Sequence, residues 1–185
     1  MKSNEIIKVV FIVDGLNLFH SIVNTLGLQN SLIDIEKLCK TIILKNEEIK
    51  SIDYFTSYFK GDSHTAILQR KLIRKNSNSK IINLNFGLLR PRSIICKYCF
   101  NEIKYFKEKY TDVNIAVKLM EKFNEPNLKK IYFISADTDF APLIQKLSNQ
   151  LNVPKIVRVS PIGRFNSSDS TYIHLKKNQL LKSRF

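Results

Sequence analysis

Residues 6–13 of this chain, IIKVVFIV, are almost continuously apolar and β-branched, and no other segment restricts the fold as strongly. A strand with one face in water alternates apolar and polar residues, whereas this run predicts a strand covered on both faces, as in a parallel sheet. An apolar stripe at helical spacing follows over residues 19–26, so a helix is expected directly after the strand. Gly15 stands between the two elements and permits a tight turn.

The same alternation of strand and helix continues along the chain. Strands are expected near residues 51–59, 80–86, 131–135 and 155–159, and helices near residues 33–45, 64–75, 113–120 and 140–147. This order predicts βαβ units, a mostly parallel sheet and a single α/β domain over residues 1–185. The helix near 113–120 is expected to bury Val113, Ala116, Val117 and Met120. Residues 88–107 break the pattern with a proline, a Cys-x-x-Cys pair and many basic and aromatic side chains, and they predict a small protruding hairpin.

Acidic and amide side chains stand where the predicted strands end or the predicted helices begin. They are Asp14, Asn17, Asp112, Asp137 and Asp139. Any one of the acids has about as good a claim to be a helix cap as to be functional. Taken together, the acids indicate a functional site more strongly than any one of them does, because the carboxyl ends of parallel strands meet at one edge of a sheet. Carboxylates about 4 Å apart repel by about 4 kcal/mol per pair at an effective dielectric of 20, so the cluster predicts bound Mg²⁺ or Mn²⁺.

The charge balance favours a polyanionic partner. Lys and Arg number 30 against 16 Asp and Glu, which gives a formal net charge of +14 and favours RNA through counterion release. A compositional bias towards Lys, Asn and Ile is the alternative explanation. The residues expected to contact RNA are Arg90, Arg92, Lys107, Lys109 and Arg164. Aromatic residues interleave with basic ones over residues 98–106, as suits single-stranded RNA; a solvated basic face with aromatics in the core explains the pattern equally well.

Cys96 and Cys99 have the spacing of half a zinc site. A tetrahedral site needs four ligands, and the chain offers only Cys39 and three histidines besides these two. Zinc bound within one chain is therefore not expected. Two chains that pair these segments could complete a site, so a homodimer is left open.

The sequence favours a cytoplasmic protein without a membrane partner. No apolar run approaches the length of about 20 residues that spans a bilayer, and the first residues lack the features of a signal peptide. Three cysteines without a disulfide framework fit the same compartment.

Three acidic motifs occur in order: DGLN at residues 14–17, EKYTDVNIAVKLM at residues 108–120 and FISADTDFAPLI at residues 133–144. They resemble the motifs of NYN domains, part of the PIN-like nuclease superfamily. The likeness is greatest to stand-alone bacterial NYN proteins and covers nearly the whole chain. It implies a Rossmann-like three-layer α/β/α fold whose acidic cleft binds Mg²⁺ or Mn²⁺ and cleaves RNA.

The resemblance also assigns roles to residues. It gives the metal and catalytic positions to Asp14, Asp112, Asp137 and Asp139, with Asn17 as the polar companion of Asp14. Lys118 stands where many relatives carry a further acid. That departure removes one ligand, so one metal ion is expected and a second is in doubt.

The leading hypothesis is a metal-dependent endoribonuclease that hydrolyses RNA phosphodiester bonds. The alternative is a NYN-fold RNA-binding or adaptor protein with weak or no catalysis, which the Lys118 departure motivates. A HAD-type phosphatase is disfavoured because Leu16 occupies the position of its second Asp, and a TOPRIM-like nuclease because Asp14 replaces its opening Glu.

Overall fold

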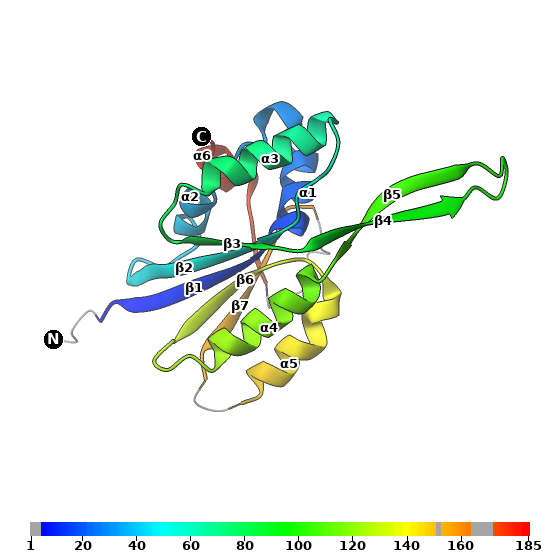
Figure 1. The fold of residues 1–185 in the computed structure, drawn as a ribbon. Coiled ribbons are helices and arrows are strands. Elements are labelled where there is room, and N and C mark those ends of the chain that lie inside the picture. The colour runs from blue at the N-terminus through cyan, green and yellow to red at the C-terminus, as the bar shows by residue number, and fades with distance from the viewer. Residues whose placement is uncertain (1–4, 151–152, 164–171) are drawn as a thin grey trace.

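The computed structural model describes residues 5–150, 153–163 and 172–185 of the chain. Its centre is a six-stranded sheet in the order β3-β2-β1-β6-β7-β8, and every neighbouring pair in it runs parallel (Figure 1). The strands are β1 (Ile7–Asp14), β2 (Glu47–Thr56), β3 (Ile82–Phe86), β6 (Lys130–Ile134), β7 (Lys155–Ser160) and β8 (Tyr172–His174). The predicted α/β architecture is confirmed.

Helices cover both faces of the sheet, which makes three layers (Figure 1). One face carries α1 (Gly15–Leu26), α2 (Ile35–Lys40), α3 (His64–Asn76) and α6 (Lys177–Lys182), and the other carries α4 (Thr111–Phe123) and α5 (Ala141–Ser148). Short 3-10 turns, η1 (Leu28–Asn30) and η2 (Thr138–Phe140), follow α1 and precede α5. None of the helices formed by the described residues combines the length and the apolar character needed to cross a membrane.

Strand β1 joins the two hydrophobic cores. Val9, Phe11 and Val13 pack in the core beneath α1, whereas Val10 and Ile12 pack in the core beneath α4 and α5. All five side chains are fully buried. This burial explains the continuous apolar run, as predicted: successive side chains of a strand point to opposite faces, and both faces of the sheet are covered.

Helix α4 buries a different stripe from the one expected. Val113, Val117 and Met120 are at least half exposed, and Ile115 and Leu119 face the sheet instead. The helix carries two rows of apolar residues at a spacing of four, and either row satisfies the helical period. Only contact with the sheet selects between them. Two other expectations were also inaccurate: the helix expected near 33–45 is the short α2, and neither β8 nor α6 was anticipated.

The hairpin expected near residues 88–107 is present as β4 (Leu88–Ile95) paired antiparallel with β5 (Glu102–Lys109). It projects from the carboxyl edge of the sheet and points away from the layers (Figure 1). Gly87 begins it, and a Cβ at that position would collide with the side chains of Thr111 and Glu108. The base of the hairpin is therefore held tightly against the start of α4.

Candidate active site

The order of the strands places a crevice between β1 and β6. From β1 the chain builds the sheet outwards through β2 and β3, and the later strands β6, β7 and β8 extend it on the other side. The connection that follows β1 therefore runs to one side of the sheet, and the connection that follows β6 runs to the other. Open α/β sheets bind ligands at the carboxyl ends of two such strands. Asp14 and Asp137 lie at these two strand ends.

Asp14 is held by hydrogen bonds on both carboxylate oxygens. The backbone N–H of Asn17 donates to Oδ1 at 3.0 Å, so Asp14 caps α1, and the Ser135 hydroxyl donates to Oδ2 at 2.9 Å. The residue is 6% exposed. The turn beyond it requires Gly15, because a Cβ there would collide with the Tyr54 ring and the Phe55 carbonyl. The capping role is thus real, and it fixes the carboxylate at the crevice.

The segment after β6 is linked to Asp14 through Ser135. The backbone N–H of Asp137 donates to Ser135 Oγ at 3.0 Å, and the N–H of Asp139 donates to Asp137 Oδ1 at 2.9 Å. Asn17 Oδ1 accepts the N–H of Ala136 at 3.2 Å. Asn17 therefore positions this segment. Ser135 stands within the third acidic motif, but sequence reasoning assigned it no role.

Asp112 reaches the same region from α4. It lies exposed in the first turn of the helix and is not the cap, since Tyr110 precedes the helix with a left-handed φ of 79°. Glu108 performs the capping task by accepting hydrogen bonds from the backbone N–H of Thr111, at 3.0 Å, and from its hydroxyl. Glu108 was missed from the sequence, although its position four residues before Asp112 at a strand end was a usable signal.

The carboxylates influence one another electrostatically. Burial is the main reason that the pKa of Asp14 rises to about 6; the hydrogen bonds from Asn17 and Ser135 oppose this rise, and the charges of Asp112 and Asp137 add to it. Burial also raises the pKa of Asp112, with further contributions from Glu108, Asp137 and Asp139. The expected acids therefore form one electrostatic cluster, which Glu108 borders.

No protein cation compensates this cluster within the described part of the chain. None of the ion pairs there includes Asp14, Asp112, Asp137 or Asp139. Oxygen donors with uncompensated negative charge suit a hard divalent cation such as Mg²⁺ or Mn²⁺. Across the described ranges, however, no three His, Cys, Asp or Glu side chains stand close enough together to hold an ion jointly. The donor chemistry fits a metal, and the spacing is wider than ligation requires.

Lys118 belongs to a different part of the surface. Its ammonium group donates a hydrogen bond to Glu121. This bond raises the pKa of Lys118, and burial opposes the rise only in part. Its other acidic neighbour is the buried Asp53 of β2. It lines a hollow of about 370 Å³ with Phe86 and other residues. Lys118 does not contribute to the pKa of Asp14 or Asp112, so the departure from the family pattern does not place a cation in the acidic cluster.

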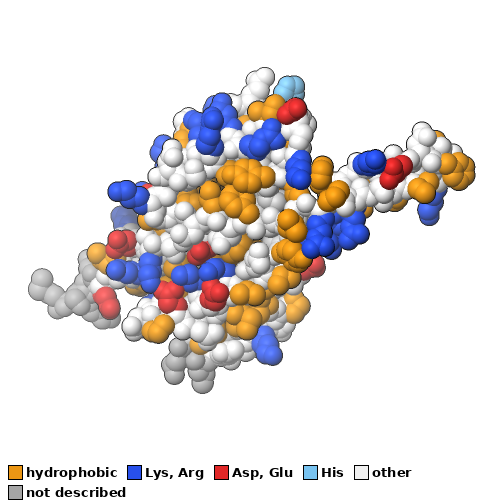
Figure 2. All heavy atoms as spheres, in the orientation of Figure 1, with side chains coloured by type: hydrophobic (Ala, Val, Ile, Leu, Met, Phe, Trp, Pro, Cys, Tyr) orange, Lys and Arg blue, Asp and Glu red, His pale blue; other side chains and the backbone are white. Residues whose placement is uncertain are grey.

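The basic residues expected to contact RNA converge on one face of the hairpin. The register pairs Leu88 with Lys109, Arg90 with Lys107 and Arg92 with Tyr105. Paired residues share a face, as do residues two apart in a strand. Figure 2 shows Lys and Arg side chains gathered where the hairpin leaves the body of the protein. The remaining expected contact, Arg164, lies outside the described residues.

Exposed aromatic side chains surround the base of the hairpin. Tyr58 and Phe86 stack with their ring centroids 4.7 Å apart and an angle of 11° between the planes, and both are at least 40% exposed. Arg90 donates to the Tyr110 hydroxyl at 3.0 Å. The Lys60 ammonium lies 4.7 Å from the centre of the Phe106 ring. The aromatic residues interleaved with basic ones at 98–106 are also exposed, so the alternative that they belong to the core is wrong: Tyr98 95%, Phe100 78%, Tyr105 45% and Phe106 48%.

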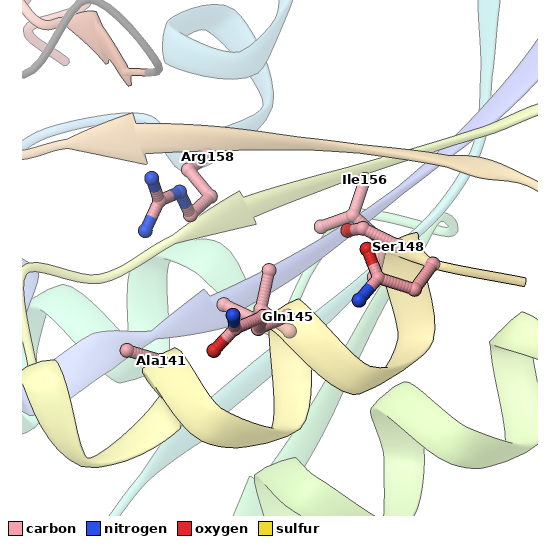
Figure 3. A pocket seen from close by; sticks show the side chains of 7 residues that line it. Ala141, Gln145, Ser148, Ile156 and Arg158 are labelled. Atoms are coloured by element: carbon pink, nitrogen blue, oxygen red, sulfur yellow. The ribbon is translucent and has the colours of Figure 1, made fainter.

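A separate hollow of about 410 Å³ lies between α5 and β7 (Figure 3). Arg158 and Gln145 line it, and the Arg158 guanidinium stacks 3.9 Å from the centre of the Tyr172 ring. None of the expected catalytic residues lines this hollow. Cys96 and Cys99 belong neither to this hollow nor to the acidic cluster. They lie in the turn that joins β4 to β5, at the tip of the hairpin.

Comparison with known proteins agrees with the fold. The family model of the NYN domain matches residues 8–173. A protein of unknown function from Vibrio parahaemolyticus has the same fold, with a TM-score of 0.59, 13% identity and coverage of 96% of this chain and 98% of that chain. No curated protein matches the chain. Because the family match spans most of its length, and the sheet and its helices agree with it, this chain belongs to the NYN domain family, with the PIN-like, nuclease-type fold of that family.

Proposed function

We propose that this protein is a metal-dependent endoribonuclease that hydrolyses phosphodiester bonds in RNA at the carboxyl edge of the sheet. The observation that carries the proposal is the cluster of acids around Asp14. It lies at the switch point of the sheet, has no ion-pairing partner among the described residues, and belongs to a chain of net charge +14. A negative focus in a positive protein suits a cation that mediates contact with a phosphate.

In this proposal the members of the cluster have separate tasks. Asp14, Asp112 and Asp137 are the residues that would hold the ion, with Asp139 at the solvent side. A bound Mg²⁺ or Mn²⁺ would supply charge neutralisation and polarise the phosphodiester. Ser135 and Asn17 keep Asp14 and the segment after β6 in position. The raised pKa of Asp14 means that this carboxyl group carries a proton below about pH 6 unless a cation displaces it.

The hairpin supports single-stranded RNA as the substrate. Its basic face can follow the phosphate backbone, and the stacked rings of Tyr58 and Phe86 offer a surface for unpaired bases. Bases in a duplex are already stacked on one another, so exposed rings favour a single-stranded substrate. Glu108 raises the pKa of Asp112 and bonds to Thr111, so the base of the hairpin lies next to the acidic cluster.

The test is cleavage of a labelled single-stranded RNA by the purified protein with Mn²⁺ or Mg²⁺. Asp14→Asn and Asp137→Asn should each abolish cleavage. Asp62→Asn is the matched control, because the Asp62 side chain is fully exposed and its ion-pair partner is Arg70, which is not part of the acidic cluster. Equal cleavage by the wild type and both cluster variants would overturn the assignment.

One observation favours a second candidate function, an RNA-binding or adaptor protein without turnover. No three acids among the described residues are spaced to hold an ion together. This candidate predicts salt-sensitive RNA binding that persists in Asp14→Asn, with no cleavage at any divalent ion concentration. Clean metal-dependent cleavage that Asp14→Asn abolishes would exclude it.

A further inference from the structure

The turn at the tip of the hairpin brings two sulfur atoms together. Cys96 N–H donates to the Asn101 carbonyl and Phe100 N–H donates to the Cys96 carbonyl, both at 2.9 Å, and these bonds close the loop. Phe100 follows Cys99 with a φ of 57°, a left-handed conformation that bulky residues seldom adopt. This turn returns the chain to β5, and both cysteines lie within the closed loop.

The loop also surrounds the Cys96 sulfur with hydrogen-bond donors. The backbone N–H of Cys99 contributes most to lowering the pKa of the Cys96 thiol, followed by the N–H of Tyr98 and the thiol of Cys99. The thiol of Cys99 is thus within hydrogen-bond reach of the Cys96 sulfur. Sulfur atoms held together by backbone N–H groups are suited to share a soft metal ion.

One chain supplies only half of the ligands that zinc takes. Structural zinc is coordinated by four ligands in a tetrahedron, most often sulfur and nitrogen. Within the residues that the structure describes, no third His, Cys, Asp or Glu completes a group with this pair. The remaining cysteine, Cys39, belongs to α2 and is buried in the core. The other two ligands must come from another molecule.

The outer part of the hairpin has the surface of a contact between proteins. Its large apolar side chains are more than half exposed: Ile94 57%, Ile95 64%, Tyr98 95%, Phe100 78% and Ile103 52%. A two-stranded hairpin without a third strand or a covering helix is only marginally stable in water. Large apolar side chains exposed together at the tip indicate an interface.

We propose that the hairpin tips of two copies of this chain pair about a two-fold axis, so that Cys96 and Cys99 from each copy bind one Zn²⁺. A two-fold axis presents the same patch on both molecules, so each tip supplies the two ligands that the other lacks. Four thiolates around Zn²⁺ carry a net charge of −2, and Lys97 lies between the two cysteines in each chain to offset it. This inference does not depend on the proposed nuclease activity.

The test measures zinc content and molar mass together, on the full chain purified under reducing conditions. We expect half a zinc ion per chain and the mass of a dimer, which chelation converts to a monomer and added ZnCl₂ restores. Cys96→Ser and Cys99→Ser should both be monomeric and lack zinc. Cys39→Ala, which removes one thiol elsewhere, should retain zinc and the dimer. Co²⁺ in place of zinc should give the visible absorption of a tetrahedral thiolate site in the wild type and in Cys39→Ala, but in neither Cys96→Ser nor Cys99→Ser.

Several results would overturn the proposal. One zinc ion per monomeric chain would mean that the same molecule completes the site. A dimer that survives chelation and both cysteine substitutions would show that the ion is not its cause. Failure to bind zinc, combined with loss of RNA binding in Tyr98→Ala, would assign the exposed tip to RNA. Cys99 is exposed and Cys96 is half-buried, and neither belongs to a hydrophobic core, so misfolding does not explain a loss of zinc; circular dichroism of the variants checks this directly.

Discussion

Replacing Asp14 by Asn should make the protein more stable at neutral pH, although the same change should abolish cleavage. Burial raises the pKa of the Asp14 carboxyl in the folded protein from 3.8 to about 6. Between these values the folded state keeps a proton that the unfolded state has released, so the free energy of unfolding falls as the pH rises. The full interval corresponds to about 3 kcal/mol, at 1.36 kcal/mol per pKa unit.

The asparagine side chain removes this charge with little loss of hydrogen bonding. Its Oδ1 can still accept the N–H of Asn17, and the Ser135 hydroxyl can accept from the new amide. The variant should therefore be more stable than the wild type by about 1 kcal/mol near pH 4.5, rising to about 3 kcal/mol near pH 7.5. Titrating groups outside the acidic cluster cancel in this difference, because both proteins contain them.

The assay is urea unfolding of both proteins across this pH range in the presence of a chelator, repeated with Mg²⁺ at neutral pH. Bound Mg²⁺ should stabilise the wild type, because an ion that binds only the folded state shifts the unfolding equilibrium. It should stabilise Asp14→Asn much less. A stability difference that stays constant between the two ends of the pH range would refute the reasoning from burial.

Three further results are expected. Gly87→Ala should lower the free energy of unfolding by about 1–3 kcal/mol, measured by urea titration, since its Cβ collides at the hairpin base and overpacking costs this much; unchanged stability would contradict that close approach. Arg90→Ala should reduce the salt dependence of RNA binding by about 0.7 in the logarithmic slope, as for one lost phosphate contact, while Lys104→Ala on the opposite face should leave it unchanged. Tyr58→Ala should weaken binding of single-stranded RNA by about 1–3 kcal/mol in a fluorescence titration, and an equal loss for duplex RNA would argue against base stacking.

The acids were predictable because their signal is local. Asp14 and Asp137 each follow a buried apolar run, and the carboxyl end of such a run marks the ligand-binding edge of a parallel sheet. Ser135 and Glu108 were not identified, since a serine or a glutamate at a strand end has many ordinary roles. Their importance lies in the hydrogen bonds that join distant segments, such as Ser135 to Asp14, 121 residues apart.

The hairpin was likewise predictable only in part. Its existence near residues 88–107 followed from composition and from the interruption of the strand–helix rhythm. The register between β4 and β5 could not be read from composition, yet it decides that Arg90 and Lys107 share a face and that Lys104 does not. A shift of one residue would reverse these faces, because side chains alternate along a strand.

The sequence by itself determined the class of fold, the order of its elements, the positive charge and the residues at which chemistry is expected. These properties depend on short-range patterns. A strand buried on both faces requires a continuous apolar run, and an acid that directly follows such a run lies at the end of that strand. Only the tertiary structure decided that β1 and β6 are neighbours and that Ile115 rather than Val117 faces the sheet. The physical reason is that strand pairing and helix orientation minimise the free energy of the whole chain, in which several local patterns are equally acceptable and long-range burial selects one.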